Sequence, residues 1–282
     1  MSCVYKGEVI NSEVSGSAKG GTEMMRDRLL NNVRPDLLKE VAIHFSRPRE
    51  LYEDNMYGIP YSECSVIYNA VEKVYNPVEK NTDEIRFVYH TTPHRGLELV
   101  VPIFDELCKE HDNIHLDVFS SFEIYGWPAR DEPYETLFEQ IRQHPKMSYH
   151  GSVSNEEVMY YLDKAHVFLY PNIWRETSCI ALIEAIKSQL ICIHPNLGAL
   201  PETASNATIM YDYHDDMGKH ANFAYSVAKQ LLDTIKTNDG YFNGFTKSDR
   251  FNLARNSIAS YSVMWNSLLI NLLDFLNEDI DG

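Results

Sequence analysis

The second half of the chain alternates short apolar runs with longer stretches of helical periodicity. Six runs have the length and the β-branched and aromatic content of buried strands: residues 85–89, 115–119, 147–150, 167–170, 190–193 and 208–211. Helical spacing falls between most of them, as in residues 97–110 and in residues 155–164, which follow Ser154 as a candidate N-cap. Alternating strands and helices predict an α/β fold built on a doubly wound parallel sheet.

The flanking parts of the chain are less regular. Residues 23–31, with Thr22 as cap, and residues 217–236 and 248–276 are typical of helices, while residues 41–45 predict a short strand. Residues 69–83 carry Pro77 and several charges, as a linker does. We therefore expect a shortened N-terminal α/β domain (1–68), this linker, a Rossmann-like domain (84–246) and a C-terminal helix that packs back (247–282).

The overall composition narrows the functional classes. With 44% hydrophobic and 23% charged residues among 282, the chain has the make-up of an ordinary globular protein. A formal net charge of -16 argues against a nucleic-acid partner. Since no apolar run approaches the roughly 20 residues of a membrane span, we expect no integral span and a cytoplasmic location. The five cysteines form no CxxC pair, which favours reduced thiols.

Residues 171–185, PNIWRETSCIALIEA, form the most informative stretch of the sequence. They follow an apolar strand, and either Thr177 or Ser178 is a candidate N-cap for the helix that comes next. The start of such a helix offers backbone N–H groups and a positive dipole end to a phosphate. Glu176 and Glu184 flank this position, and their carboxylates can accept hydrogen bonds from a sugar or a ribose.

Other polar loops follow the ends of neighbouring predicted strands, and in a parallel sheet they share one edge: residues 90–96, 120–130, 151–154 and 172–178. Arg95 lies beside a glycine and suits a diphosphate; the alternative, a surface cation near a helix start, is less favoured because the helix dipole there repels a cation. Tyr125 and Trp127 are suited to lining a base pocket or to simple packing. The Gly20-Gly21 step before a helix permits close approach of a ligand, or is an ordinary flexible loop.

Several enzyme classes lose support. The strand-end histidines have no spacing typical of a metal site, so we expect no bound metal: His90, His94, His150 and His194. The chain also lacks GxSxG, HExxH, GxGxxG and a Walker lysine loop. A serine hydrolase, a zincin, a phosphate-loop NTPase and a dinucleotide-dependent oxidoreductase are therefore not indicated.

Taken together, these segments resemble the retaining, nucleotide-sugar-dependent glycosyltransferases of the GT-B fold, family 4 type. The resemblance rests on an E-x7-E signature from Glu176 to Glu184 and on five further segments: GGTE at 20–23, IRFVYHTTPHRGLELVV at 85–101, YHGSVSNEEV at 149–158, a small-residue helix, and GALPE at 198–202. HTTPHRGLELVVP, SSFEIYGW and IWRETSC also resemble a viral or bacterial branch of the family.

The resemblance implies a metal-independent hexosyltransferase that needs no cofactor and uses a UDP-, GDP- or ADP-sugar as donor substrate. The acceptor would be a sugar, a lipid or a protein. Glu176 and Arg95 would be catalytic, with Glu176 facing the transferred sugar. Substrate binding would fall to Gly20, Gly21, His90, Arg95, Thr177, Ser178, Cys179 and Glu184. A nucleotide-sugar-binding module with little transferase activity, or a GT-B-like sugar-nucleotide epimerase, are the alternatives.

Two departures from the family pattern stand out. Many relatives carry Gly-Arg where this chain has Tyr89-His90, so one phosphate contact is either missing or supplied by His90. The N-terminal domain is short by the usual size of domains. Residues 54–61 also lack the histidine that relatives place near the reacting sugar, and His44 is not a clear substitute.

Overall fold

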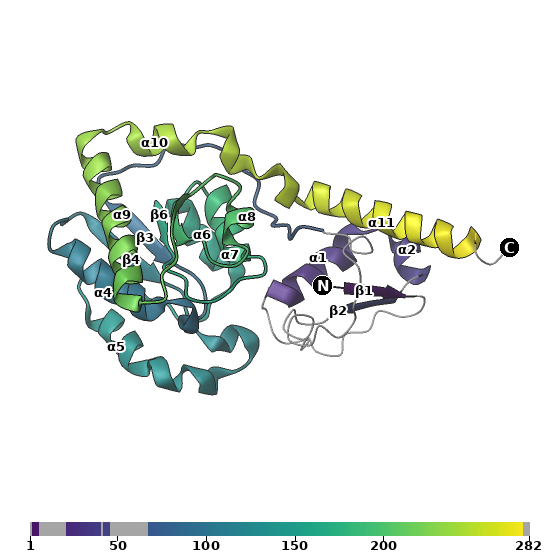
Figure 1. The fold of residues 1–282 in the computed structure, drawn as a ribbon, viewed down its shortest axis with the longest axis horizontal. Helices are drawn as coiled ribbons and strands as arrows, with labels where there is room; N and C mark the ends of the chain where they lie inside the picture. Colours follow the sequence, from purple (N-terminus) through teal and green to yellow (C-terminus); the bar gives the residue numbers. More distant parts are fainter. Residues whose placement is uncertain (1, 6–20, 41, 46–66, 279–282) are drawn as a thin grey trace. The chain divides into compact units, whose positions relative to one another are not determined.

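The computed structural model describes residues 2–5, 21–40, 42–45 and 67–278 (Figure 1). These residues form two compact units. The first unit takes in the chain up to Glu72 and again from Ala254, and the second runs from Lys73 to Leu253. The expected linker, residues 69–83, is therefore divided between the two units.

The second unit is built on a six-stranded parallel sheet in the order β5-β4-β3-β6-β7-β8. The strands are β3 (Ile85–Tyr89), β4 (Ile114–Val118), β5 (Met147–Tyr149), β6 (Val167–Leu169), β7 (Ile191–Pro195) and β8 (Ile209–Tyr211). All six predicted strands are present within a few residues, which confirms the doubly wound parallel sheet. Because the order reverses between β3 and β6, the loops after these two strands meet at a topological switch point.

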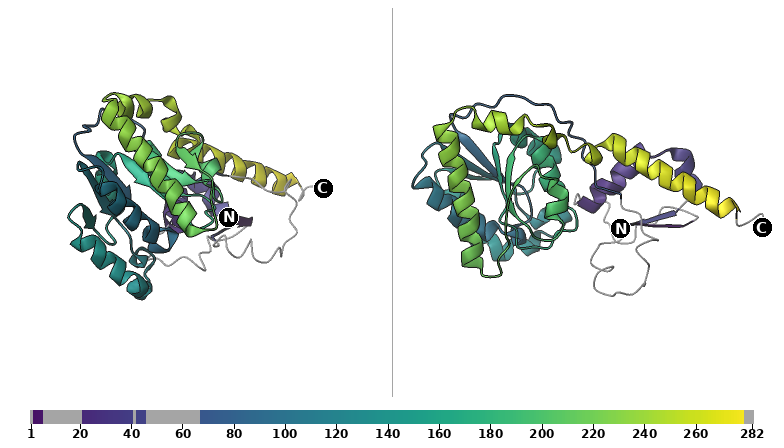
Figure 2. Two further views of the ribbon diagram at one scale, coloured as in Figure 1. Left: turned by 60° about the vertical axis from the view of Figure 1, so that its left-hand side comes forward. Right: turned by 45° about the horizontal axis from the view of Figure 1, so that its top comes forward.

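Helices cover both faces of this sheet (Figures 1 and 2). α4 packs against α9, and α7 packs against α6 and α8. The helices of the unit are α4 (Leu97–Cys108), α5 (Glu135–Gln143), α6 (Asn155–Lys164), α7 (Ile180–Lys187), α8 (Leu200–Ala204), α9 (Met217–Thr237) and α10 (Tyr241–Thr246). Short 3-10 segments join them: η2 (Pro93–Arg95), η3 (Phe122–Tyr125), η4 (Pro128–Tyr134) and η5 (Asp249–Asn252).

The core of the unit lies where the central strands meet these helices. Phe87 on β3 and Phe168 on β6 are fully buried, and every residue of β6 and β7 is buried. Removing each such side chain from water contributes about 1.5–3 kcal/mol. Ser154 caps α6 as expected, because its side chain accepts a hydrogen bond from the Glu157 N–H at 3.2 Å.

Three predicted helix starts are wrong. α1 (Gly21–Asn32) already includes Thr22, so Thr22 is not its N-cap. The helix after residues 171–179 begins at Ile180. Its N-cap residue is Cys179 rather than Thr177 or Ser178, and the Cys179 side chain accepts no capping hydrogen bond. The last helix does not begin at residue 248 but at Ile258, as α11 (Ile258–Glu278). Leu253 has a left-handed φ of 43°, which a right-handed helix cannot contain, so η5 and η6 (Ala254–Asn256) precede α11.

Among its described residues, the first unit combines a two-stranded antiparallel sheet, β1 (Ser2–Tyr5) and β2 (Ala42–Phe45), with three α-helices. α11 packs against α1 (Gly21–Asn32) and α2 (Pro35–Glu40), and the Tyr261 hydroxyl on α11 donates to the carbonyl of Met25 at 3.1 Å. The helix predicted at residues 23–31 and the strand predicted at 41–45 are thus present. Within the described ranges, no helix is both long enough and apolar enough to span a bilayer.

Candidate functional site

Arg95 and Glu176 form an ion pair between the loops that follow β3 and β6. Arg95 ends η2, and its Nη1 donates to Oε1 of Glu176. Only 19% of the Arg95 side chain and 5% of the Glu176 side chain are exposed. The pKa of the guanidinium, which burial lowers, is raised on balance by the Glu176 carboxylate. The two residues predicted to be catalytic therefore lie together at the carboxyl edge of the sheet.

Three further groups fix the positions of these two charges. The Tyr170 hydroxyl donates to Oε1 of Glu176 at 2.7 Å, and Nε of Arg95 donates to Oγ1 of Thr92 at 3.1 Å. Glu176 is also held by its backbone, since its carbonyl accepts the N–H of Ala199 at 2.8 Å. Burial raises the pKa of the Tyr170 hydroxyl far above its ordinary value, so Tyr170 remains a neutral donor to the carboxylate.

The start of α7 lies directly after this pair. Thr177 is exposed, Ser178 is half-buried and Cys179 is buried, so the predicted binding residues occupy the approach to the helix. The first N–H groups of any helix lack partners within the helix, and here they follow Glu176 by only a few residues. Burial raises the pKa of the Cys179 thiol, which keeps it protonated. The positive end of α7 thus follows closely in the chain on Glu176 of the Arg95–Glu176 pair.

Glu184 lies in the second turn of α7 and is 5% exposed. The side-chain amide of Asn155, at the start of α6, donates to its Oε1 at 3.3 Å. Glu184 therefore faces the start of α6 from α7, and both helix starts belong to the same edge of the sheet as Glu176.

His90 follows β3 and contacts the first turn of α7. Its Nε2 lies 3.1 Å from the carbonyl oxygen of Ala181. A carbonyl oxygen only accepts hydrogen bonds, so we assign the proton to Nε2, which leaves a lone pair on Nδ1. Burial lowers the pKa of His90 to about 4, so the ring is neutral at physiological pH. His90 therefore does not offer the permanent positive charge of the arginine found in relatives.

An aromatic group borders the ion pair. The His94 ring stacks on Phe122 at 5.1 Å and meets Trp174 edge to face at 4.9 Å. Tyr125 and Trp127, weighed as base-pocket residues, contact each other at 5.6 Å, and the guanidinium of Arg130 lies over the Trp127 ring. Both side chains are half-buried, and a role in lining a base pocket stays a prediction.

Two of the predicted binding residues, Gly20 and Gly21, belong to the first unit. Gly20 falls outside the described residues, and Gly21 is the first residue of α1 in the first unit. Their expected roles stay predictions.

Sequence reasoning missed Tyr170, Asn172 and Gly198. Asn172 is fully buried, and its Oδ1 accepts the N–H of Trp174 at 3.0 Å. Gly198 has a φ of +59°, and a Cβ there would lie 2.7 Å from the carbonyl oxygen of Glu176. The glycine that opens the GALPE segment is a usable signal for close backbone approach, whereas nothing local marks Tyr170.

Comparison with known proteins decides the family. Residues 72–238 match the family model described as "Glycosyl transferases group 1". The chain belongs to this family. The match spans most of the second unit and contains Arg95, Glu176 and Glu184, which gives the segments singled out in the sequence a common context.

Two curated relatives of this group 1 chain carry related names. The Saccharomyces cerevisiae "Phosphatidylinositol N-acetylglucosaminyltransferase GPI3 subunit" is 21% identical over 174 residues, which cover 60% of this chain and 36% of that protein. An Arabidopsis thaliana protein, likewise named as part of a phosphatidylinositol N-acetylglucosaminyltransferase, is 26% identical over 150 residues, which cover 51% of this chain and 32% of that protein. The chain thus spans about a third of the length of these curated relatives.

Solved structures of glycosyltransferases share the fold of the group 1 chain. A glycosyltransferase from Rickettsia africae superposes with a TM-score of 0.59 at 15% identity, covering 80% of this chain and 61% of that one. The sucrose-phosphate synthase of Thermosynechococcus elongatus gives a TM-score of 0.60 at 16% identity, covering 81% and 57%. The GT-B-like α/β fold is confirmed, while the finer assignment to a viral or bacterial branch stays a prediction.

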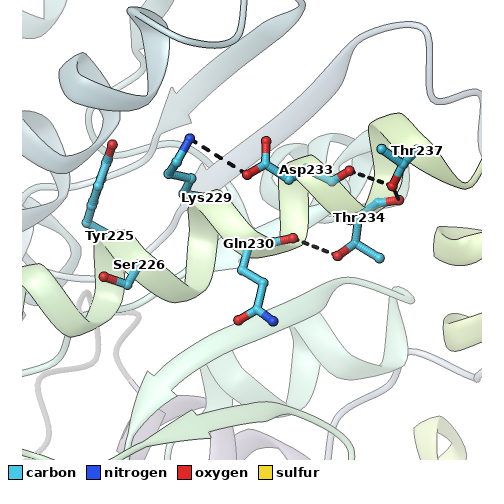
Figure 3. A pocket seen from close by; sticks show the side chains of 7 residues that line it. All are labelled: Tyr225, Ser226, Lys229, Gln230, Asp233, Thr234 and Thr237. Atoms are coloured by element: carbon cyan, nitrogen blue, oxygen red, sulfur yellow. Dashed lines mark hydrogen bonds and ion pairs between the residues drawn. The ribbon is translucent and has the colours of Figure 1, made fainter.

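Neither a metal-binding cluster nor the hollow along α9 provides a second candidate site among the described residues. In the part of the chain that the structure describes, no group of three or more His, Cys, Asp and Glu side chains could hold a metal ion. Figure 3 shows the side chains that line a hollow along α9, where Lys229 pairs with Glu110 and the Thr234 hydroxyl donates to the Gln230 carbonyl. It is lined by Tyr225, Ser226, Lys229, Gln230, Asp233, Thr234 and Thr237. It is a solvated face of one helix.

Proposed function

We propose that this chain binds a nucleoside-diphosphate sugar and transfers the sugar, with retention of configuration, to an acceptor. The observation that carries the proposal is the buried Arg95–Glu176 pair at the start of α7, with Glu184 one helical turn beyond that start. A diphosphate needs fixed positive charge and N–H donors, and a sugar needs carboxylate acceptors. The positive charge and the carboxylates lie together here, in the segments that follow the neighbouring strands β3 and β6.

Donor binding would exchange the partner of Arg95. Without donor, Arg95 and Glu176 neutralise each other, which limits the cost of burying both charges. The diphosphate would take over the guanidinium as a bidentate partner and would also meet the N–H groups at the start of α7. Glu176 would then be free to accept hydrogen bonds from the sugar, while Glu184 would accept from the ribose hydroxyls.

The chemistry would follow from this arrangement. As the bond from the anomeric carbon to the diphosphate oxygen breaks, negative charge grows on the leaving diphosphate, and Arg95 and the α7 dipole would stabilise it. The sugar would acquire oxocarbenium character, which the Glu176 carboxylate favours electrostatically. An acceptor hydroxyl would form the new bond on the face that the diphosphate leaves and pass its proton to the departing phosphate, which gives retention.

A donor panel tests the proposal. UDP-, GDP- and ADP-sugars would be compared by thermal shift and then by donor hydrolysis, and the names of the curated relatives place N-acetylglucosamine first among the sugars. We expect one nucleotide series to stabilise the chain and its sugar to be released. The absence of stabilisation by every nucleotide would overturn the proposal. Binding without hydrolysis or transfer would identify a binding module, and isomerised donor would identify an epimerase.

A further inference from the structure

Trp174 is a large apolar side chain that remains half open beside the ion pair. It is 47% exposed and lies two residues before Glu176, of which only 7% is exposed. A single exposed tryptophan needs no explanation on an ordinary surface. Its setting here is not ordinary, because its backbone and its ring are both fixed.

The backbone of Trp174 is held from both sides by one buried side chain. Asn172 is fully buried, its Oδ1 accepts the Trp174 N–H at 3.0 Å, and its Nδ2 donates to the Trp174 carbonyl. Burying an amide is unfavourable unless its polar atoms are hydrogen-bonded, so the asparagine is committed to this one loop conformation. The loop therefore presents Trp174 in a fixed place.

The indole is also positioned by a second element. His94, the residue before Arg95, meets the Trp174 ring at 4.9 Å and 82°, and its other contact is the Phe122 ring, stacked at 5.1 Å. Phe122 is 8% exposed and so forms a firm base for this row of three rings. The row thus runs from η3 through His94 of η2 to Trp174 in the loop before Glu176.

We propose that Trp174 forms an aromatic wall for the pyranose ring of the transferred sugar, and that it sets how much affinity the sugar adds to the nucleotide. The inference rests on the proposed function of this site. One face of a pyranose consists of C–H groups, which pack on an aromatic ring while the hydroxyls at the rim reach polar partners. Glu176 supplies such a partner two residues away, so the Trp174 indole and the Glu176 carboxylate would hold the same sugar ring.

The test compares the affinity of the whole chain for a nucleoside diphosphate with its affinity for the corresponding nucleotide sugar, by calorimetry. In Trp174→Ala the gain in affinity from the sugar should fall about tenfold, while the dissociation constant of the nucleoside diphosphate stays within about twofold. Trp174→Phe should restore most of the gain because it keeps an aromatic face. Trp174→Leu, which keeps apolar bulk without the ring, should not.

Phe223→Ala is the matched control, since Phe223 is equally exposed at 46% but lies on α9. It should leave both affinities unchanged. An equal effect of Trp174→Ala on nucleotide and nucleotide sugar, or no effect on either, would overturn the inference while leaving the donor site intact. A chain that binds no nucleoside diphosphate at all would instead contradict the proposed function.

Discussion

Arg95 and Tyr170 share one oxygen of Glu176, although the ion pair joins residues 81 positions apart in the sequence. The guanidinium supplies positive charge and the hydroxyl supplies a neutral hydrogen bond at 2.7 Å. Because Glu176 is almost fully buried, its charge is tolerated only with such partners. Arg95, Tyr170 and Glu176 therefore form one group of interacting side chains, and removing one of them changes the electrostatic environment of the other two.

A double-mutant cycle should reveal this dependence. Arg95→Met leaves a buried carboxylate without its counter-charge and should lower the free energy of unfolding by about 3 kcal/mol. Adding Glu176→Gln removes that charge, so the double variant should be less destabilised than the sum of the single variants. Urea unfolding measures all four chains.

Lys109→Met provides the control for the cycle, because Lys109 pairs with Glu106 on the exposed surface of α4. It should leave the free energy of unfolding nearly unchanged, because an exposed ion pair contributes little to stability. Strictly additive effects of the Arg95 and Glu176 changes would show that the pair does not hold the site together.

Substitution of Glu184 should mainly affect nucleotide affinity, whereas substitution of Glu176 should mainly affect turnover. Glu184→Ala should weaken the binding of nucleoside diphosphate by about tenfold, as expected for the loss of a hydrogen bond to a charged acceptor. Glu176→Gln should instead lower the turnover of donor by about a hundredfold with little change in nucleotide affinity, because its charge acts on the developing cation. Calorimetry and donor hydrolysis separate the two effects. Small and equal losses in both variants would mean that the glutamates are structural.

The sheet was predictable because its central strands, β6 and β7, are buried along their whole length. A continuous apolar run between turn signals is typical of such a strand, and the predicted run at 85–89 coincides with β3. The prediction for 190–193 ended two residues before Pro195, the last residue of β7, because proline is not expected to continue a strand. α5 was not singled out, since only Phe138 and Ile141 mark its buried side.

The start of α7 could not be predicted from capping preferences alone. Thr177 and Ser178 are good N-cap residues, yet the helix begins after Cys179. The loop is fixed from elsewhere in the fold, because the Glu176 carbonyl bonds to the N–H of Ala199 and Asn172 holds Trp174. These are tertiary contacts, so no capping pattern records them.

The partners within the site were beyond prediction for the same reason. Arg95 and Glu176 were each expected at the carboxyl edge, but their pairing depends on β3 and β6 being neighbours, with β4 and β5 displaced to one side. Strand order is a property of the assembled sheet. Tyr170 ends an apolar strand run and gives no sign in the sequence that its hydroxyl reaches a carboxylate.

Removing that hydroxyl should affect catalysis more than folding. Tyr170→Phe removes one of two hydrogen bonds to Oε1 of Glu176 and should cost about 1 kcal/mol of stability, together with a measurable loss of donor turnover. Tyr149→Phe removes a hydrogen bond of 2.8 Å to the Ser120 carbonyl in the same unit, away from the ion pair. Chemical denaturation should show similar losses of stability in Tyr170→Phe and Tyr149→Phe. Donor hydrolysis should be slower in Tyr170→Phe and unchanged in Tyr149→Phe. Full activity in both would exclude Tyr170 as a positioning residue.

Buried neutral histidines should make the fold sensitive to acid. His194 is fully buried, its Nε2 contacts Thr208 Oγ1 at 2.8 Å, and burial lowers its pKa to about 4. The unfolded chain takes up this proton near pH 6.5 and the folded chain only near pH 4, so stability is lost as the pH falls between these values. In His194→Gln the slope of unfolding free energy against pH should decrease by about 1.4 kcal/mol per pH unit in this window. Urea unfolding at several pH values measures the slope, and an unchanged slope would show that His194 does not titrate in this way.

Gly198 should be the position at which a single methyl group damages the site most directly. Its φ of +59° is unfavourable for any side chain, and a Cβ there would lie 2.7 Å from the carbonyl oxygen and 2.8 Å from the nitrogen of Glu176. Backbone atoms cannot turn aside as a side chain does, so the Glu176 loop would have to move away from Arg95.

Gly126 separates this clash from the strain of a left-handed conformation. Its φ is +74°, but no atom lies within 4 Å of the Cβ it would carry. Gly126→Ala should therefore lose only about 1–2 kcal/mol of stability and keep its donor affinity. Gly198→Ala should lose more stability and also bind donor more weakly, because the ion pair and the start of α7 shift with the loop. If denaturation and donor titration gave the same result for the two variants, the close approach of Gly198 to Glu176 would not be what holds the site in place.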